Sequence, residues 1–371
     1  MIEVFLMKKE WDVIIIGGGP AGSTAARYSA KDGISVLVLD GKKEIGEPLQ
    51  CGELIPSVDE LRRLCPDVPE MEDLFQTPES AISLRTEKLK LVPPSGKALE
   101  FPFEGLMLDR VEHDKALVRL AKSKGVEFLT EAYISKVEGN NVHTRDGKIF
   151  SGKVILGCGG VNDPIRRDYW NENSLNIPVK FMLINGDYDE SSVELHFGSS
   201  APGGYAWVFP KKNGANIGLG IQKKYSKGKN LKYFANKFYS KYEGEVVFQG
   251  AGALPMSGSL KSMVKDNKLL VGDAAGMVLP SNGAGISTSM IGARIAGQVV
   301  AEHILNDLPL SEYERIWKNQ MGKIMKNSQR SLAVGSLLFR SPDFLVNLAF
   351  NRITKKLLWR AVTCRAKFGI I

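Results

Sequence analysis

Residues 11–40, "WDVIIIGGGPAGSTAARYSAKDGISVLVLD", constrain the fold more than any other part of the sequence. The apolar run 13–16 predicts a buried strand that passes directly into a glycine-rich turn. Helix formers follow over 23–30, and a second apolar run at 36–39 predicts another strand. A strand–turn–helix–strand unit of this length joins two parallel strands, so we expect an α/β fold built on a parallel sheet.

The glycines of this turn have the spacing of a phosphate-binding motif, G-x-G-x-x-G. Gly17 permits the tight turn, Gly19 lets the backbone approach a pyrophosphate, and Gly22 lets the helix pack against the strand. Asp40 ends the second strand, where a carboxylate can accept hydrogen bonds from ribose hydroxyls. The motif therefore predicts a bound dinucleotide, held by Gly17, Gly19, Pro20, Ala21, Gly22 and Asp40.

A second glycine-rich segment, "KLLVGDAAGMVLPSNGAGIS", predicts a strand over 268–271 and a helix from Ile286. It resembles the G-D-A motif of FAD enzymes of the glutathione-reductase and aromatic-hydroxylase types. In those enzymes the Asp contacts the ribityl chain or its adjoining phosphate, and the helix N-terminus faces the flavin ring, where its dipole favours negative charge. The first motif alone leaves NAD open, but a nicotinamide-only enzyme has no use for the second. The resemblance implies FAD, in contact with Gly272, Asp273, Gly283, Gly285 and Ile286.

A third segment, "LMLDRVEHDKALVRL", predicts a helix that begins after Asp109. The same enzymes carry an Arg at this helix start that contacts FAD, and the resemblance gives that role to Arg110. The alternative is an ion pair of Arg110 with Glu112 or Asp114 at this terminus of the helix. The following "TEAYISKV" resembles the strand whose backbone meets the adenine, which places that contact near Ala132.

The segment "GCGGVNDPIRR" stands where hydroxylase-like enzymes carry A-D-G-x-x-S-x-V-R. Gly159 takes the place of the Asp, Asp163 takes the place of the Ser, and Arg166 falls on the Arg position. The missing Asp is associated in the hydroxylases with flavin and NADPH handling. Direct use of NADPH is therefore in doubt.

Residues 167–254 lose the alternation of strand and helix and consist of successive strand patterns, which predict an inserted antiparallel sheet. Within "GGYAWVFPKK", the side chains of Tyr205, Trp207 and Phe209 occupy alternate positions and share one face of a strand. Two interpretations fit this pattern. The strand either belongs to the core of the sheet or forms an aromatic wall for a flat or apolar ligand.

The motif Y-x-W-x-F-P at residues 205–210 is similar to the signature of the geranylgeranyl reductase family. The loop "EIGEPLQCGE" resembles that family's P-x-x-C-G loop, and "LPSNGAGI" resembles its flavin-side turn. The resemblance extends to about residue 305. Family members use FAD to reduce isolated double bonds of prenyl chains in archaeal ether lipids or in the chlorophyll side chain.

This resemblance implies a dry, apolar site in which hydride addition is coupled to proton delivery. Cys51 is the candidate proton donor or flavin-side contact; the alternative is that it only packs beneath its loop. We expect Cys51, Tyr205 and Trp207 to be catalytic, Phe209 and Pro210 to line the substrate, and Cys51 and Gly52 to contact the cofactor.

Another class of enzyme shares the implied fold. A flavin-dependent monooxygenase or halogenase acting on a hydrophobic substrate is the alternative, because halogenases carry a similar W-x-W-x-I-P strand. The electron donor stays open between NADPH, reduced ferredoxin and another low-potential donor.

The composition is that of an ordinary globular protein, with 371 residues, 43% hydrophobic and 24% charged. The four cysteines lack the paired spacing of a zinc site, a disulfide framework or an iron–sulfur cluster, so we expect no metal and a reducing, cytoplasmic compartment.

The net charge of +8 is concentrated in the last fifty residues, where Asp343 is the only acid among ten basic residues and many apolar ones. This basic amphipathic segment predicts peripheral binding to the inner face of a membrane. The alternative is a helical cap with a solvated basic face. Nucleic acid is a further candidate partner for such charge, but no binding motif accompanies it, so we expect none.

We therefore expect a discontinuous FAD-binding domain over 8–74, 105–166 and 255–305. Residues 75–104 and 167–254 are predicted to form the antiparallel substrate domain. A C-terminal basic helical region is predicted for 306–371.

Overall fold

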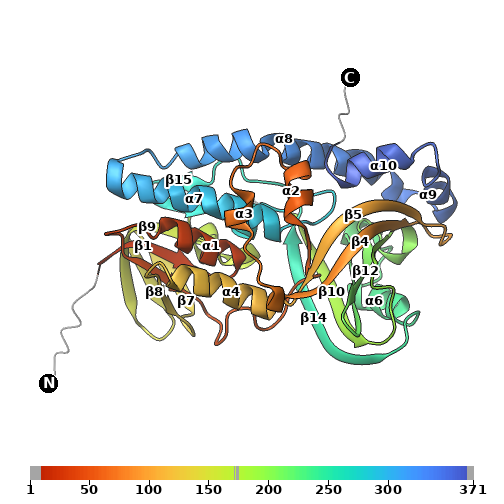
Figure 1. The fold of residues 1–371 in the computed structure, drawn as a ribbon, viewed down its shortest axis with the longest axis horizontal. Helices are drawn as coiled ribbons and strands as arrows, with labels where there is room; N and C mark the ends of the chain where they lie inside the picture. Colours follow the sequence, from red (N-terminus) through yellow and green to blue (C-terminus); the bar gives the residue numbers. More distant parts are fainter. Residues whose placement is uncertain (1–9, 171, 173–174, 366–371) are drawn as a thin grey trace.

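The structure is a computed structural model that describes residues 10–170, 172 and 175–365. Two β-sheets lie side by side along the length of the molecule, and long C-terminal helices run along one edge of both (Figure 1). The expected α/β architecture with an inserted sheet is confirmed. The first two residues of the predicted FAD-binding domain, and the end of the basic tail with Lys367, lie outside the described part of the chain.

The first sheet has the strand order β15-β16-β9-β1-β2-β6, and the hairpin β7-β8 joins it through β9. Ile14 of β1 pairs in parallel with Leu37 of β2 and with Ile155 of β9. These strands are buried on both faces, as their continuous apolar runs predict. Their bounds are β1 Glu10–Ile16, β2 Val36–Leu39, β6 Glu127–Leu129, β7 Ile134–Glu138, β8 Asn141–Thr144, β9 Ile149–Gly157, β15 Val264–Lys265 and β16 Lys268–Leu270.

Helices cover this sheet and begin at the glycine turns. Helix α1 (Pro20–Ser29) starts directly after Gly19 and packs against α7 (Ile286–Asn306) and α4 (Arg110–Lys122). Pro20 suits the first position of α1 because its missing N–H would have no partner there. Helix α8 (Glu312–Gly335) lies along α7 (Figure 1). Shorter helices are α2 Val58–Leu64, α3 Met71–Leu74 and α5 Pro164–Tyr169.

The second sheet has the strand order β14-β10-β13-β12-β11-β4-β5-β3 and is mostly antiparallel. One face, with Ala206 and Val208, forms a core with helix α6 (Leu231–Tyr239). The other face carries Trp207 and Phe209. The bounds are β3 Leu54–Pro56, β4 Ile82–Val92, β5 Leu99–Leu108, β10 Asn176–Asn185, β11 Ser192–His196, β12 Ala206–Lys211, β13 Gly214–Gly220 and β14 Glu245–Pro255.

The second sheet reaches beyond the predicted domain boundaries in two places. Strand β3 falls within the predicted FAD-binding segment 8–74, and the last four residues of β5 fall within 105–166. Both belong to the second sheet because Leu54 pairs with Met107, and Met107 pairs with Leu84 of β4. Composition could not reveal this, since the pairing joins strands about fifty residues apart.

The C-terminal helices α9 (Asp343–Ala349) and α10 (Lys355–Val362) lie against the second sheet (Figure 1). Trp359 stacks on Phe101 of β5 with ring centroids 4.9 Å apart, and Phe350 meets Phe197 at 5.2 Å. No helix in the described ranges has the length and apolar character needed to cross a bilayer.

Candidate functional site

A cavity of about 410 Å³ lies between the two sheets. Its wall combines the start of α1, the loop before β3, the start of α4, the aromatic face of β12 and the turn that leads into α7. Segments far apart in the sequence thus meet at one site. The predicted site residues that line it are Gly19, Pro20, Ala21, Cys51, Gly52, Arg110, Tyr205, Trp207, Phe209, Asp273, Gly283, Gly285 and Ile286.

Other predicted residues lie outside the cavity lining: Gly17, Gly22, Asp40, Ala132, Pro210 and Gly272. Pro210 alternates with Phe209 along β12, so its ring falls on the face that carries Ala206 and Val208. The expectation that Pro210 lines the substrate overlooked this alternation.

The glycines of the first turn differ in their surroundings: Gly17 and Gly22 are tightly packed, whereas Gly19 faces open space. Gly17 has φ +99°, and a Cβ there would lie 2.5 Å from the carbonyl oxygen of Cys158. A Cβ on Gly22 would lie 1.7 Å from the carbonyl oxygen of Gly17. A Cβ on Gly19 meets no atom of the described residues within 4 Å, and Gly19 lines the cavity. The space beside Gly19, at the N-terminus of α1, fits a pyrophosphate.

The side chain of Asp40 accepts hydrogen bonds from the backbone of this turn and from Lys42. Its Oδ2 accepts a hydrogen bond from the Gly18 amide at 2.6 Å, and its Oδ1 accepts one from the Lys42 amide at 2.7 Å. The amide of Ala132 donates to the carbonyl of Asp40 at 2.9 Å. The ribose contact of Asp40 and the adenine contact near Ala132 remain predictions.

The second glycine turn forms another part of the cavity wall. Gly283 has φ +72°, and α7 begins after Gly285. Ser287 in the first turn of α7 lines the cavity, and its buried hydroxyl has no hydrogen-bond partner among the described residues. Burial raises the pKa of Asp273 to about 6. Unpaired polar groups at a helix N-terminus fit a polar cofactor whose hydroxyl or carbonyl groups would satisfy them.

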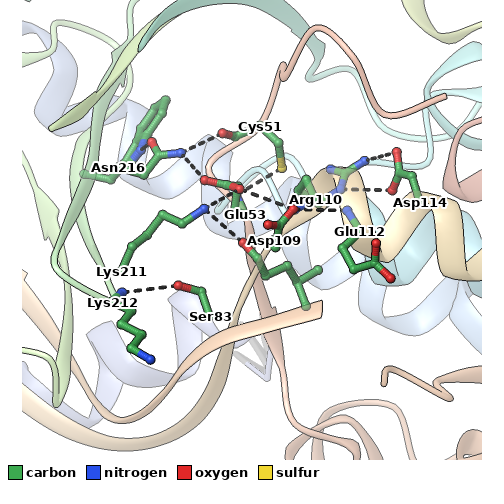
Figure 2. Close-up of polar contacts among 12 residues, drawn as sticks. Cys51, Glu53, Ser83, Asp109, Arg110, Glu112, Asp114, Lys211, Lys212 and Asn216 are labelled. Atoms are coloured by element: carbon green, nitrogen blue, oxygen red, sulfur yellow. Dashed lines mark hydrogen bonds and ion pairs between the residues drawn. The ribbon is translucent and has the colours of Figure 1, made fainter. Parts of the chain in front are cut away.

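Cys51 and Arg110 lie side by side at the cavity wall (Figure 2). The amide of Glu53 donates to Cys51 Sγ at 3.1 Å. Removal from water raises the pKa of the Cys51 thiol, although the nearby Arg110 charge acts in the opposite direction. Cys51 therefore stays a neutral thiol at ordinary pH, which is the form that can donate a proton.

Arg110 forms the ion pair that the sequence left as an alternative. Its Nε and Nη2 donate to the two carboxylate oxygens of Asp114 at 3.1 and 2.9 Å. Glu112 instead pairs with Arg119. Because both Arg110 and Asp114 also line the cavity, the ion pair leaves the cofactor contact of Arg110 open.

The aromatic side chains of β12 and of Tyr205, which directly precedes it, form one continuous surface. The rings of Tyr205 and Trp207 lie 6.3 Å apart at 62°, and those of Trp207 and Phe209 lie 6.1 Å apart at 30°. They pack in the core of the second sheet and also line the cavity. The same side chains therefore belong both to the core and to the cavity wall, and their contact with an apolar ligand stays a prediction.

Sequence reasoning missed a polar cluster that lies beside this aromatic surface, on the face where Asn216 pairs with Phe209. Glu53, Lys211 and Asn216 are joined by hydrogen bonds beneath Cys51 (Figure 2). Asn216 is the single amide in the apolar strand "ANIGLG", and such an isolated polar residue in a buried strand could have drawn attention to it.

In the segment that departs from the hydroxylase motif, Asp163 binds the backbone and caps a helix. The carboxylate of Asp163 accepts from the amides of Gly159 at 2.7 Å and Arg166 at 3.0 Å, and so caps α5. A Cβ on Gly159 would lie 2.9 Å from that carboxylate. Arg166 donates to the carbonyl of Ala274 at 2.9 Å and so supports the turn that contains Gly272 and Asp273.

Comparison with known proteins agrees with this geometry. The model of the geranylgeranyl reductase catalytic domain matches residues 174–253, and that of an NAD(P)-binding Rossmann-like domain matches residues 15–49. Among solved structures, a geranylgeranyl bacteriochlorophyll reductase-like protein of Thermoplasma acidophilum is similar with a TM-score of 0.76 and 24% identity, over 94% of this chain and 98% of that one. A flavin-dependent brominase is similar with a TM-score of 0.69 and 18% identity, over 97% and 96%.

Curated relatives match almost from end to end. Digeranylgeranylglycerophospholipid reductase 1 of Methanococcoides burtonii is 32% identical over 95% of each chain. Digeranylgeranylglycerophospholipid reductase 3 of Methanosphaera stadtmanae is 34% identical over 94% of this chain and 93% of its own. At this identity and coverage, the chain is an oxidoreductase that has the fold of flavin-dependent enzymes and belongs to the digeranylgeranylglycerophospholipid reductase family.

Proposed function

We propose that this protein is an FAD-dependent reductase that saturates isolated C=C bonds of geranylgeranyl chains, in archaeal membrane ether lipids or their precursors. The observation that carries the proposal is a cavity that joins the open glycine turn at Gly19 to an apolar aromatic wall with a neutral thiol beside it. The names of the curated relatives support the same substrate class.

FAD, when bound in its reduced form, supplies a hydride to one carbon of the alkene. An isolated alkene has no carbonyl to stabilise the resulting charge, so the other carbon must receive a proton in a coupled step. Cys51 holds that proton on Sγ. Arg110 lies close enough to stabilise the thiolate that remains, and water then restores the thiol.

The aromatic wall has a separate task. Tyr205, Trp207 and Phe209 hold an apolar chain by contact area and exclude water from the reacting carbons. Each buried methylene contributes about 0.8 kcal/mol, so a prenyl chain binds tightly without polar contacts.

Peripheral attachment to the inner face of the membrane belongs to the proposal, with support from exposed side chains of the C-terminal region. We call these residues the tail surface: five exposed apolar side chains, of which Ile353 is 93% and Leu337 is 74% accessible, with basic residues between them in the sequence. It consists of Leu337, Phe344, Leu348, Ile353, Leu357, Arg340, Arg352, Lys356 and Arg360. Apolar groups that enter a bilayer and cations that meet anionic head groups are the two elements of peripheral binding.

The opposite side of the same helices faces inward. Trp359 stacks on Phe101, and Val362 lines the cavity. The tail region therefore caps the second sheet and also presents the tail surface, which favours a lipid that passes from the bilayer toward the cavity.

A reoxidation experiment tests the proposed reaction. Enzyme-bound flavin is reduced photochemically without oxygen, and geranylgeranyl lipid is then added. We expect the oxidised flavin spectrum to return and the lipid to gain two hydrogen atoms per reaction. Reoxidation only by oxygen, with incorporation of oxygen or halide into an aromatic substrate, would favour the monooxygenase or halogenase alternative. Supplying NADPH or reduced ferredoxin in place of light then identifies the electron donor.

A further inference from the structure

The indole of Trp207 is held on three sides. Its ring lies over Gly218, where a Cβ would come within 2.2 Å of the indole Cζ2. On another side, a Cβ on Gly52 would lie 3.6 Å from the indole Nε1. That Nε1–H donates a hydrogen bond to Oδ1 of Asn216 at 2.9 Å. Trp207 therefore lies with Phe209 against the Cys51 loop, and its hydrogen bond to Asn216 orients the indole.

Asn216 is fully buried and can hold only one orientation. Its Nδ2 donates to the carbonyl oxygen of Cys51 at 2.9 Å and to Oε2 of Glu53 at 3.0 Å. Both partners are acceptors, so a flipped amide would place its one oxygen against both of them and its NH₂ against the indole N–H. One amide thus connects the Cys51 loop with the aromatic wall.

Glu53 and Lys211 keep this amide in place (Figure 2). Glu53 is 1% exposed and its φ is +70°, which a glutamate adopts only when its surroundings require it. Its Oε1 accepts from Lys211 Nζ at 2.8 Å. Lys211 also donates to the carbonyl of Leu108 at 3.3 Å. The buried carboxylate of Glu53 is therefore paired with Lys211. The backbone amide of Glu53 donates to Cys51 Sγ.

We propose that Asn216 is a positioning residue for the reduction, because it fixes the Cys51 thiol loop at one distance from Trp207. This inference rests on the proposed function for its catalytic meaning. The reacting carbons lie on the aromatic wall and the proton comes from the loop, so a shift between the two lowers the rate without weakening chain binding.

Asn216→Asp tests the proposal because aspartate is isosteric. It can still accept from the Trp207 indole, but its second oxygen faces two acceptors, the Glu53 carboxylate and the Cys51 carbonyl. Repulsion displaces the loop at high pH. When the two carboxylates share a proton at lower pH, the repulsion between them ends and one of the two lost donors returns. Lys211, Arg110 and Cys51 are the other ionisable groups around Glu53, and the wild-type protein controls for their titration.

The first readout is the alkylation rate of Cys51 by iodoacetamide in the apoprotein, resolved by peptide mass spectrometry. We expect the variant to react at least about fivefold faster than wild type near pH 8 and at nearly the same rate near pH 6. Lys212→Ala is the matched control, since this exposed neighbour of Lys211 faces solvent. A variant-to-wild-type ratio near one at both pH values, or an equal increase at both, would overturn the inference.

The second readout is turnover with chemically reduced FAD enzyme. In Asn216→Asp we expect kcat to be roughly tenfold below wild type near pH 8 and to recover near pH 6, with KM changed little. A loss that is equal at both pH values, or one that follows FAD loss, would indicate a merely structural role and reject the inference. If wild type itself reduces no prenyl lipid, the proposed function fails, whereas the alkylation ratio still decides the role of Asn216.

Discussion

The hydroxyl of Tyr205 donates a hydrogen bond to the carbonyl oxygen of Asn282 over 2.5 Å. Tyr205 begins the aromatic wall, and Asn282 lies in the turn that leads into α7. The Nδ2 of Asn282 in turn donates to the carbonyl of Val362 at 2.9 Å. The aromatic wall, the proposed flavin-side turn and the C-terminal helices are thus joined through one residue.

Tyr205→Phe keeps the ring and removes this bond. We expect a loss of about 1 kcal/mol in stability, as for one buried hydrogen bond, with FAD content unchanged. Burial raises the pKa of Tyr205 well above its usual range, so the phenol is a donor in the wild type throughout the accessible pH range. Urea unfolding measures the stability, flavin absorbance measures the FAD content, and single-turnover lipid reduction measures the activity. Loss of lipid turnover by a factor of 100 or more would instead indicate that the hydroxyl acts in the chemistry.

Two glycine variants separate folding from cofactor binding. Gly19→Val adds a side chain where no protein atom lies within 4 Å, so the apoprotein should fold while FAD no longer binds. Gly17→Val forces a β-branched residue to φ +99° against the Cys158 carbonyl and should impair folding itself. Circular dichroism and flavin absorbance distinguish the outcomes. Normal FAD content in Gly19→Val would place the pyrophosphate elsewhere.

Cys51→Ala should retain FAD but lose alkene reduction by roughly 10²- to 10⁴-fold, the usual contribution of a positioned acid. Because burial raises the pKa of this thiol, wild-type activity should persist at alkaline pH and fall only when the thiol ionises. The matched control is Cys65→Ala, since Cys65 also lines the cavity. Equal turnover in Cys51→Ala and Cys65→Ala would reduce Cys51 to a packing residue.

The raised pKa of Asp163 predicts how the stability of the apoprotein depends on pH. Burial raises its pKa from 3.8 to about 6, so the folded state binds a proton more tightly than the unfolded state does. The unfolding free energy should therefore fall by on the order of 3 kcal/mol as the pH rises from about 4 to about 6, and then level off. Asp163→Ser, which keeps a capping side chain, should remove this part of the slope in urea titrations. A slope that the substitution leaves unchanged would assign the titration to another group.

The sequence predicts the parts of this structure that local patterns determine. The first βαβ unit, the helix after Asp109 and the alternation along β12 follow from periodicity and glycine spacing, and they place the cavity between the two sheets. The Glu53–Asn216 bond could not be predicted in this way, because its partners are 163 residues apart and no local period relates them. The same holds for strand β3, whose sheet is decided by its pairing with β5.

The tail surface gives the last prediction, because its apolar and basic residues respond differently to salt. Exposed cations attract anionic lipid through a field that salt screens, whereas inserted side chains do not depend on ionic strength. Replacing Arg352, Lys356 and Arg360 with Gln should therefore weaken sedimentation with anionic liposomes at low salt only. Lys355 is left in place because its ammonium lies over the Phe101 ring.

The double variant Leu348→Glu and Ile353→Glu should instead reduce sedimentation at both low and high salt. Leu305→Glu is the control, since Leu305 is an exposed apolar residue of α7 outside the tail surface. If membrane supply of substrate depends on this surface, the double variant also loses turnover of bilayer lipid while it keeps turnover of a short soluble prenyl alcohol. Full sedimentation of both tail variants would contradict the membrane assignment, and the tail region would then serve only as the cap that Trp359 and Phe101 form.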